Sequence, residues 1–489
     1  MIRTSRSSSA RAVRQAMEPK AARQTREQRE PKIMAFPARL SRAELLAKGE
    51  ELRAKVPRSS HAAWKPTSGR PDPLRLIKDS DKGRLAELVP IRHGRMLKSP
   101  FTFYRGAALN MAADLATTPA SGPRVQACGD AHLLNFGIYA TPERRLVFDV
   151  NDLDETLPAP WEWDLKRLTT SFVLACRSNG LSEDDARDAA LACSRSYREH
   201  MAEFSRMPAL EVWYASLDVD TYLPQVKDLQ SRKRMRKRLA KARKQTVAEH
   251  DFPKLADTAS EAVTIRDNPP LIYHWHELDR HEYVADVRRA YARYRDTLPE
   301  ERRALLDRFE IKDMAIKVVG VGSVGTFCAI LLLMAAEDDP LFLQIKEANA
   351  SVLEAYAGKS IYPNHGERVV RGCLLMQSAS DLFLGWTEGK LGRQFYVRQL
   401  RDMKTKILVE LFQLADMIQY AEFCGFTLAR AHARSGESAL ISGYLGQSDT
   451  FDKAIAAFSV AYADQSEKDH AVLMKAVRNG DLDVVTEPD

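Results

Sequence analysis

The sequence has little cysteine, and its cysteines are scattered. Six Cys are spread over 489 residues and no two of them form a CxxC pair, which excludes a disulfide framework and a zinc ribbon. Cysteines of this kind are typical of small buried apolar side chains in a reducing cytosol, so a cytoplasmic location is expected. The composition and the absence of a visible repeat also exclude a collagen-like chain, a coiled-coil rod and a wholly disordered chain.

The chain also lacks a clear targeting or membrane segment. Residues 1–32 have no apolar core of the kind that a secretory signal needs. They are rich in Arg and Ser, as mitochondrial transit peptides are, but a disordered, solvated tail is the simpler interpretation. One uncharged window, 318–336, is 19 residues long, but it begins with a glycine turn and charged residues bound it closely. No membrane association is therefore predicted.

Positive charge is concentrated in two short segments. Of the formal net charge of +7, residues 1–32 carry +6 and residues 231–244 carry +9, which leaves the rest of the chain at −8. A mildly acidic body is not expected to coat nucleic acid, so no nucleic-acid partner is predicted. The basic run at 231–244 is interpreted as an exposed helix.

The length favours two or three lobes. The order of patterns along the chain is helical, β-hairpin, helical, β-rich and helical. We therefore expect a disordered basic tail (1–40), a helical lobe with a catalytic and metal-binding hairpin (41–310), a small β-rich nucleotide-binding lobe (311–402), and C-terminal helices that complete the helical lobe (403–489).

Local patterns place the elements within these regions. Helical spacing is expected at 41–53, at 105–116, in a helix capped by Asp164, in a helix after Ser182, and at 407–434. Short apolar runs bounded by turn residues predict strands at 124–128, 136–140, 145–150, 314–319, 327–334, 341–345, 368–377 and 394–400.

The loop GDAHLLNFG carries the first group of candidate site residues, Asp130, His132 and Asn135. An Asp followed five residues later by an Asn, on a rigid loop, suits phosphoryl transfer. In that chemistry the Asp accepts or orients the attacking hydroxyl, and the Asn amide oxygen reaches a metal on the phosphates. Asp130 is thus the candidate catalytic residue, with His132 beside it.

A second acidic segment, FDVNDLDE, follows the predicted hairpin and contains Asp149, Asp152, Asp154 and Glu155. Carboxylates that converge in this way repel one another unless a cation is present. Carboxylate oxygens are the ligands that Mg²⁺ prefers. A magnesium site is expected here together with Asn135, and Asp149, Asp152 and Asp154 all stay open as its ligands.

A glycine loop, GVGSVG, follows the predicted strand AIKVV and places glycines at 320, 322 and 325. Two interpretations compete. In a Rossmann unit the loop opens a helix and a later acid, here Asp338 or Asp339, binds ribose. In a kinase-type lobe the loop is the tip of a β-hairpin over ATP phosphates. The nucleotide-binding candidates on the loop are Gly320, Gly322, Ser323 and Gly325.

The kinase-type interpretation also needs a lysine on a later strand. LFLQIKEA supplies Lys346 inside an alternating apolar run, where a lysine facing phosphate has a reason to lie. Glu354 is the candidate to orient Lys346, with Glu347 as the nearer alternative. Arg105 and Arg398 are candidates to hold phosphate or substrate bidentately, or to form ordinary salt bridges.

Together these motifs resemble protein-kinase-like enzymes of the aminoglycoside-phosphotransferase and choline-kinase type. GDAHLLN resembles their HGDxxxxN catalytic loop, with Cys128 where the His usually stands, and NDLDE resembles their metal-binding DFG segment. In that group a helix follows at the distance that separates Asp152 from Asp164. The resemblance therefore favours Asp152 over Asp149 as the metal ligand.

More narrowly, the chain resembles a bacterial family known as domain of unknown function 2252. The stretches that carry this resemblance lie roughly between residues 90 and 470 and include RMLKSPFTFYRGAA, GDAHLLNFG, FDVNDLDET, PWEWDLKRL, GVGSVGT, FLQIKEA and LARAHARSG.

The order of the motifs departs from that of ordinary kinases. The catalytic loop precedes the glycine loop and Lys346, and LARAHARSG at 428–436 resembles the helix that normally leads into the catalytic loop. The implied fold is a two-lobed, protein-kinase-like α+β fold that is circularly permuted, which is physically allowed when the chain ends lie close together. Lys346 and Asp152 should then lie within about 10 Å of each other, close enough to share a phosphate chain and its metal.

The resemblance implies a phosphotransferase that uses ATP and Mg²⁺ and acts on a hydroxyl of a small-molecule acceptor. No activation-loop signature lies between Asp152 and Asp164, which favours a small molecule over a protein as acceptor. Two alternatives stay open, a nucleotide-binding pseudokinase without turnover and an NAD-binding Rossmann-type oxidoreductase. The oligomeric state cannot be predicted.

Overall fold

The computed structural model describes residues 40–226, 228–243, 247, 251–257, 263–274, 280–336, 339–400 and 407–486. The expected tail, up to residue 39, and the expected boundary at 402 lie outside these residues. Contacts divide the chain into Met1–Ser41 and Arg42–Asp489, and the description below concerns the second unit. This unit has a mixed α+β fold.

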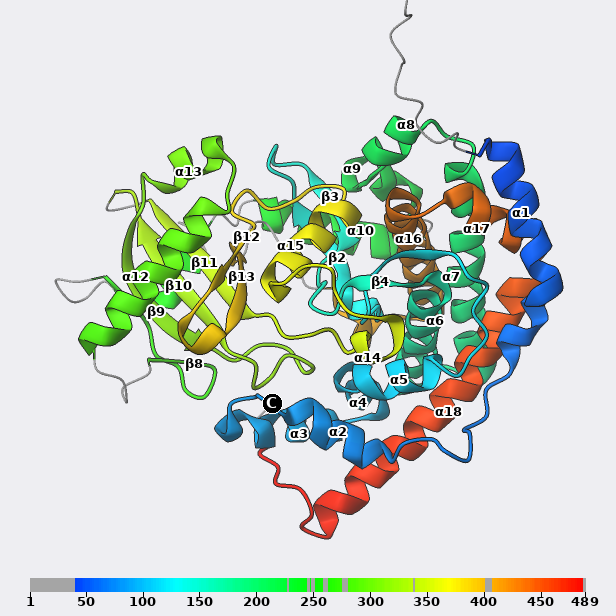
Figure 1. The fold of residues 1–489 in the computed structure, drawn as a ribbon, viewed down its shortest axis with the longest axis horizontal. Helices are drawn as coiled ribbons and strands as arrows, with labels where there is room; N and C mark the ends of the chain where they lie inside the picture. Colours follow the sequence, from blue (N-terminus) through cyan, green and yellow to red (C-terminus); the bar gives the residue numbers. More distant parts are fainter. Residues whose placement is uncertain are drawn as a thin grey trace, which may run out of the picture. The chain divides into compact units, whose positions relative to one another are not determined.

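Long helices that pack against one another form the core of one part of the unit (Figure 1). They are α6 (Trp161–Ser178), α7 (Glu183–Phe204), α16 (Leu414–Ser435) and α18 (Thr450–Arg478). Apolar side chains from all four join one buried cluster, in which Trp161 stacks on Tyr197 at 5.6 Å between ring centroids. Helix α7 begins with a capping box between Ser182 and Asp185, as expected for a helix after Ser182.

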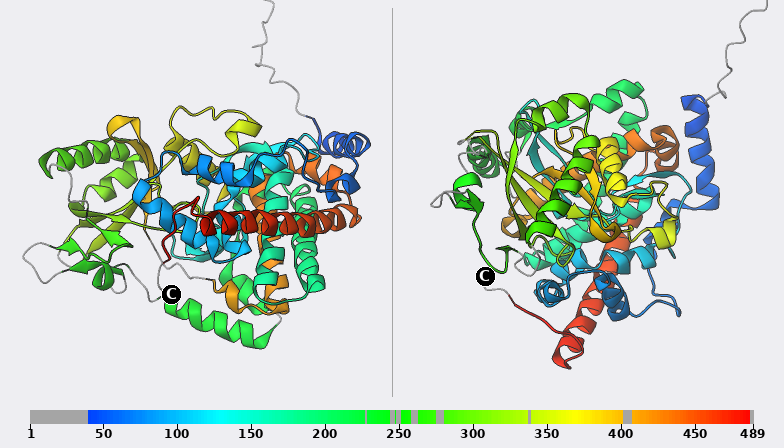
Figure 2. Two further views of the ribbon diagram at one scale, coloured as in Figure 1. Left: turned by 90° about the horizontal axis from the view of Figure 1, so that it is seen from below. Right: turned by 60° about the vertical axis from the view of Figure 1, so that its left-hand side comes forward.

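Shorter helices surround this core. Helix α18 lies alongside α2, α3 and α4, which come from the opposite end of the chain (Figure 2). The helices are α1 (Arg42–Lys55), α2 (Pro73–Asp81), α3 (Val89–Leu97), α4 (Pro100–Gly106), α5 (Ala108–Leu115), α8 (Ala209–Tyr214), α9 (Val219–Tyr222), α10 (Leu229–Arg243), α11 (Phe252–Leu255), α14 (Glu354–Ala357) and α17 (Ser438–Leu445). The basic run is thus helical in α10, except that Lys244 lies outside the described residues.

The predicted hairpin is confirmed and lies in a three-stranded sheet, beside a separate two-stranded sheet. Strand β2 (Phe136–Ala140) pairs antiparallel with β3 (Leu146–Val150), which also pairs with β5 (Leu217–Asp218). Strand β1 (Arg124–Ala127) pairs with β4 (Leu157–Pro160). The backbone N–H of Asn151 donates to the carbonyl of Asn135 at 2.7 Å. The loop after β1 and the loop after β3 therefore lie side by side.

A six-stranded antiparallel sheet forms the second part of the unit, in the order β12-β13-β11-β10-β9-β8. Helices α12 (Arg280–Asp296) and α13 (Glu300–Leu306) cover one face, and β6 (Ala256–Asp257) and β7 (Thr264–Ile265) pack on the other. The strands are β8 (Ile272–Tyr273), β9 (Glu310–Lys317), β10 (Cys328–Met334), β11 (Pro340–Glu347), β12 (Gly385–Glu388) and β13 (Gln394–Gln399).

Several boundaries differ from expectation. The strand expected at 368–377 is wrong, because the segment is α15 (His365–Met376), whose N-cap Asn364 accepts a hydrogen bond from the N–H of Glu367. Its buried apolar residues, Val369, Val370, Cys373 and Met376, recur at helical spacing. The helix expected from 407 starts only at Leu414, and the one expected at 105–116 is divided between α4 and α5.

Asp164 is not the N-cap that was expected. Helix α6 begins at Trp161 after Pro160, and Asp164 lies buried inside its first turn. The uncharged window at 318–336 contains the glycine loop and β10. Within the described ranges, the structure contains no helix of the length and apolarity needed to cross a bilayer.

Candidate functional site

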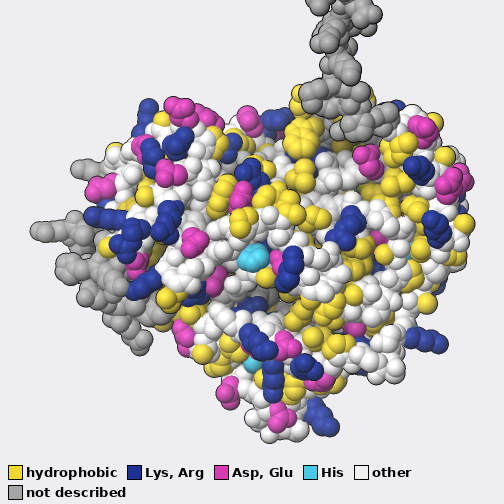
Figure 3. Space-filling model, in the orientation of Figure 1, with side chains coloured by type: hydrophobic (Ala, Val, Ile, Leu, Met, Phe, Trp, Pro, Cys, Tyr) yellow, Lys and Arg dark blue, Asp and Glu magenta, His cyan; other side chains and the backbone are white. Residues whose placement is uncertain are grey.

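A cavity of about 420 Å³ collects most of the predicted site residues. Its walls come from the loop after β1, the segment after β3, the glycine loop, the segment after β11 and the helices α2–α5. The predicted residues that line it are Arg105, Asp130, His132, Asn135, Asp152, Asp154, Gly320, Gly322, Ser323 and Glu354. Side chains of both charge signs are interspersed on the molecular face shown in Figure 3.

A carboxylate of α6 forms hydrogen bonds with the backbone of the loop that carries Asp130. The Asp164 carboxylate accepts hydrogen bonds from the backbone N–H groups of Cys128 at 2.5 Å and Gly129 at 3.0 Å. His432 of α16 contacts the same carboxylate at 3.2 Å. Gly129 has φ +80°, and a Cβ at this position would lie 2.4 Å from the carbonyl oxygen of Glu155. Only glycine therefore fits this turn, and the loop is fixed by buried groups.

Asp130 lies at the cavity with one oxygen bound to a buried arginine. The Nε of Arg167 donates to Oδ1 of Asp130 at 2.7 Å, and the Asp130 side chain retains 20% exposure. The Nδ2 of Asn135 donates to the backbone oxygen of Asp130 at 2.7 Å. Arg167 was missed by sequence reasoning. The signal in the sequence is a basic residue three positions after Asp164 on the same predicted helix.

Lys346 meets the acidic segment, as the kinase-type interpretation expected. Its Nζ lies 2.5 Å from Oδ2 of Asp154 and 3.4 Å from Oδ1 of Asp152. The expected proximity of Lys346 and Asp152 is confirmed. Burial acts to lower the pKa of Lys346, but the two carboxylates outweigh it and raise this pKa well above its usual value. The Tyr396 hydroxyl donates to Oδ1 of Asp154 at 2.5 Å.

The acids expected to orient Lys346 have other partners. Glu354 begins α14, 3.5 Å from Lys359, and Glu347 forms an ion pair with Arg393 at 2.6 Å. Among the described residues, the structure gives Lys346 no ion pair with either glutamate. Asp154 takes the place that was assigned to Glu354, because the acidic loop reaches the end of β11 directly.

Asp149, by contrast, lies away from the cavity. It is fully buried on β3, forms an ion pair with Arg430, and accepts hydrogen bonds from the N–H and hydroxyl of Ser378 at 2.7 and 2.6 Å. Its oxygens are thus occupied by structural partners. Asp149 therefore does not fit the metal role that stayed open for it.

Three further candidates, Lys346, Arg398 and Gly325, are likewise not part of the cavity wall. Arg398 donates to the carbonyl of Asn151 at 3.0 Å and to Oε1 of Gln344 at 3.1 Å, so it supports the acidic segment as an ordinary structural contact. Gly325 lies against the side chain of Arg84.

The glycine loop connects β9 to β10, two antiparallel strands, and no helix follows it. A dinucleotide-binding turn instead leads from a strand into a helix. A Cβ at Gly322 would lie 3.0 Å from the carbonyl oxygen of Arg105 and 4.0 Å from Oδ2 of Asp130. The loop thus closes over the segment that carries Asp130. Asp338, one of the acids named for ribose binding, lies outside the described residues.

Arg105 lines the cavity on the side of Asp130. It is partly buried, and its Nε makes no hydrogen bond within the described part of the chain. Burial lowers the pKa of Arg105, while the charge of Asp130 acts in the opposite direction. Lys82, Arg84 and Lys359 also line the cavity. The wall of the cavity therefore carries cationic side chains as well as acidic ones.

His132 should be neutral at physiological pH. Its side chain is 4% exposed, and burial lowers its pKa to about 4. We expect an NMR titration to show the His132 resonance, assigned with His132→Gln, moving near pH 4. His274, whose pKa Asp313 and Asp267 raise against the effect of burial, should titrate above 6.5 as an internal reference. A His132 midpoint near 6.5 would contradict the burial of this loop.

Fold and cavity together define an α+β protein in which an antiparallel sheet and a helical part share a charged cavity. The chain belongs to the family described as an uncharacterized protein conserved in bacteria (DUF2252), whose profile matches residues 84–476. Comparison with curated proteins gives no match, and comparison with solved structures gives none either.

Proposed function

We propose that the protein is a phosphotransferase that uses ATP and Mg²⁺ and acts on a hydroxyl of a small-molecule acceptor. The observation that carries the proposal is the contact of Lys346 with Asp152 and Asp154 across 194 and 192 residues. Asp152 and Asp154 line the cavity that also holds Asp130, Asn135 and the glycine loop, whereas Lys346 is buried and is not part of the cavity wall. These are the parts that phosphoryl transfer requires.

Each residue has a role in this proposal. Asp130 orients the acceptor hydroxyl, and the glycine loop covers the phosphates with its backbone. Lys346, already at the acidic segment, binds the phosphates. Arg105, beside Asp130, holds an anionic group of nucleotide or acceptor.

The donor set fits magnesium. Among the described residues, no group of three or more His, Cys, Asp or Glu side chains is arranged as a metal cage. Magnesium in phosphoryl-transfer sites needs only one or two protein ligands, because phosphates and waters supply the rest. Asn135 and Asp152 line one cavity and offer the oxygens that this ion prefers. When bound, the ion neutralises charge on the transferred phosphate.

The proposed fold is a two-lobed, kinase-like arrangement that is circularly permuted. Helix α16, which carries LARAHARSG, packs against β1, the strand that leads into the Asp130 loop. The hydroxyl of Ser435 accepts a hydrogen bond from the N–H of Gln126 at 3.1 Å. The end of α16 thus lies beside the strand that it would directly precede in an unpermuted chain.

One observation favours a pseudokinase as the second candidate. The Arg167 guanidinium binds the Asp130 carboxylate, which leaves less of that carboxylate for an incoming hydroxyl. The oxidoreductase alternative has no such support, since the glycine loop joins two strands. A cytoplasmic location, without a membrane or nucleic-acid partner, remains part of the proposal.

Asp152→Asn tests the metal assignment. We expect Mg²⁺ to strengthen ATP binding to the wild type by about tenfold or more, and we expect this gain to be lost in the variant because a charged ligand is removed. Calorimetric titration with and without Mg²⁺ measures both affinities.

The matched control is Asp79→Asn, which removes an acid that also lines the cavity but is not assigned to the metal. It should keep the full magnesium gain. An unchanged gain in a folded Asp152→Asn protein would move the assignment to Asp154.

A further inference from the structure

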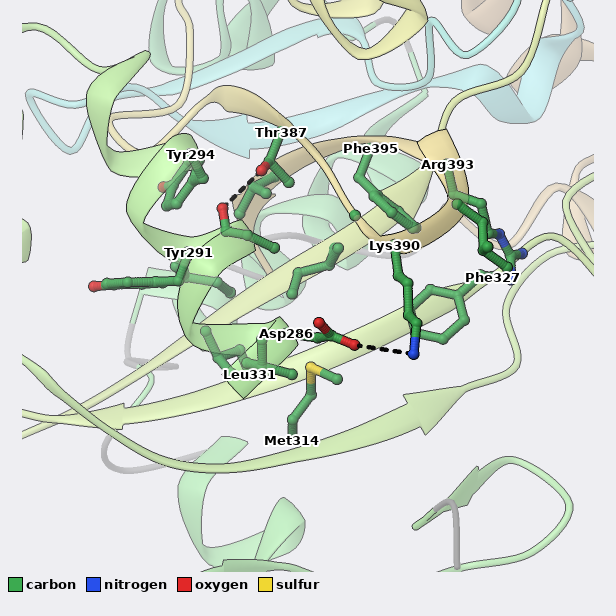
Figure 4. A pocket seen from close by; sticks show the side chains of 17 residues that line it. Asp286, Tyr291, Tyr294, Met314, Phe327, Leu331, Thr387, Lys390, Arg393 and Phe395 are labelled. Atoms are coloured by element: carbon green, nitrogen blue, oxygen red, sulfur yellow. Dashed lines mark hydrogen bonds and ion pairs between the residues drawn. The ribbon is translucent and has the colours of Figure 1, made fainter. Parts of the chain in front are cut away.

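A second pocket, of about 270 Å³, lies between α12 and the outer face of the six-stranded sheet (Figure 4). It is separate from the charged cavity and nearly all of its wall is apolar or aromatic. Side chains of Tyr291, Leu331, Leu343, Ile345 and Phe395 form much of this wall.

Several polar side chains around this pocket already have hydrogen-bond or ion-pair partners within the protein. The Thr387 hydroxyl donates to the carbonyl of Ala290 at 2.6 Å, and the Tyr294 hydroxyl donates to the carbonyl of Phe383 at 2.7 Å. At the rim, Lys390 lies 3.9 Å from Asp286 (Figure 4), so opposite charges offset each other. The pocket therefore suits an uncharged, apolar molecule.

The hairpin between β12 and β13 places an unusual residue at the edge of the pocket. Leu391 lines the pocket, is 92% exposed, and has φ +59°. A leucine in this backbone region is strained, and its exposed apolar side chain is not stabilised by burial. Strain of this kind is characteristic of functional segments. A leucine that folds down onto an apolar ligand would gain the burial that it now lacks.

We propose that this pocket binds a neutral molecule of two or three aromatic rings and that Leu391 closes over it. An apolar cavity of about 150 Å³ holds benzene, so 270 Å³ has room for a second ring or more. The aromatic walls suit flat rings. Residues 1–32 contain no aromatic side chain, so this segment does not offer the flat rings that the walls suit.

The pocket also contacts residues that anchor the glycine loop. Phe327, on the pocket wall, follows this loop, and its N–H donates to Oε2 of Glu347 at 3.0 Å. Arg393 lines the pocket, binds Glu347 and lies 5.5 Å from the centre of the Phe327 ring. Glu347 in turn lines the charged cavity. A ligand in the pocket therefore contacts the supports of the other site, whether or not that site transfers phosphate.

N-phenyl-1-naphthylamine, a neutral probe whose fluorescence rises in apolar surroundings, tests the proposal on the full chain. We expect saturable binding to the wild type. Ala290→Phe places a ring inside the pocket and should weaken binding by at least tenfold. Ala292→Phe adds the same ring on the exposed side of α12, and it should bind the probe as the wild type does. No saturable binding to the wild type, or wild-type affinity in folded Ala290→Phe, would overturn the site.

Leu391→Gly tests closure with a readout that a purely structural role would not move. Glycine relieves the strain at a positive φ, so the melting temperature should stay the same or rise. The probe should nevertheless bind several-fold more weakly, because the closing side chain is missing. Unchanged affinity in this variant would overturn the closing role of Leu391.

Discussion

Arg430→Met should lower the free energy of unfolding by about 3–5 kcal/mol, the scale found when one partner of a buried ion pair is removed. Asp149 and Arg430 are 0% and 1% exposed at their side chains. Methionine matches much of the arginine volume, so the main loss is the charge that Asp149 needs. Denaturation in urea, with an unchanged slope, measures the effect.

The double variant Asp149→Asn/Arg430→Met should recover most of this loss. Asparagine is neutral and still offers an oxygen to Ser378, so no buried charge remains unpaired. Lys453→Ala, which breaks the exposed pair with Asp449, should leave the denaturation midpoint nearly unchanged. If Arg430→Met were as harmless as Lys453→Ala, the buried pair of Asp149 and Arg430 would not contribute to stability as expected.

Asp130→Ala should lower kcat by on the order of 10²-fold or more, with little change in ATP affinity. A carboxylate that positions a hydroxyl matters in the transition state more than in the ground state. Lys346→Ala should weaken both kcat and ATP affinity, because in the proposed function Lys346 binds the phosphates of the nucleotide before and during transfer. Steady-state kinetics and ATP titration on the same preparations separate the two effects.

Both substitutions leave a charge without its partner, so folding must be monitored. Asp130→Asn keeps an oxygen for Arg167 and should show the same kinetic loss with a smaller change in melting temperature. A wild-type protein that binds ATP tightly but consumes none with any hydroxyl acceptor tried would end the enzyme proposal and leave the pseudokinase.

Local patterns in the sequence predict what local interactions decide. The short apolar runs at β9, β10 and β11 and the capping residue Ser182 are examples, because each depends on neighbours within a few residues. At α15 the strand prediction is wrong, because six apolar residues in a ten-residue segment fit either a strand or a helix. Strand β12, of four residues, was missed because it is too short to show alternation.

The site could be predicted in part. The clustering of Asp130, Asn135 and Asp152 followed from two loops beside one hairpin. The difference between Asp149 and Asp152 could not be predicted, because it depends on Arg430, which lies 281 residues from Asp149. Arg167 was missed for a similar reason: a charged residue on a helix shows its partner only once the fold brings the Asp130 loop against it.

The contact between Asp164 and His432 sets an order of events during protein synthesis. His432 leaves the ribosome 268 residues after Asp164, which at about 5–20 residues per second corresponds to about 10–60 s. During that interval the nascent chain already contains β1 and α6, but α16, which packs against both, does not yet exist. Their apolar surfaces then face water or a chaperone. The order of segments that assembles this site therefore also gives the growing chain a long period in which it is prone to aggregate.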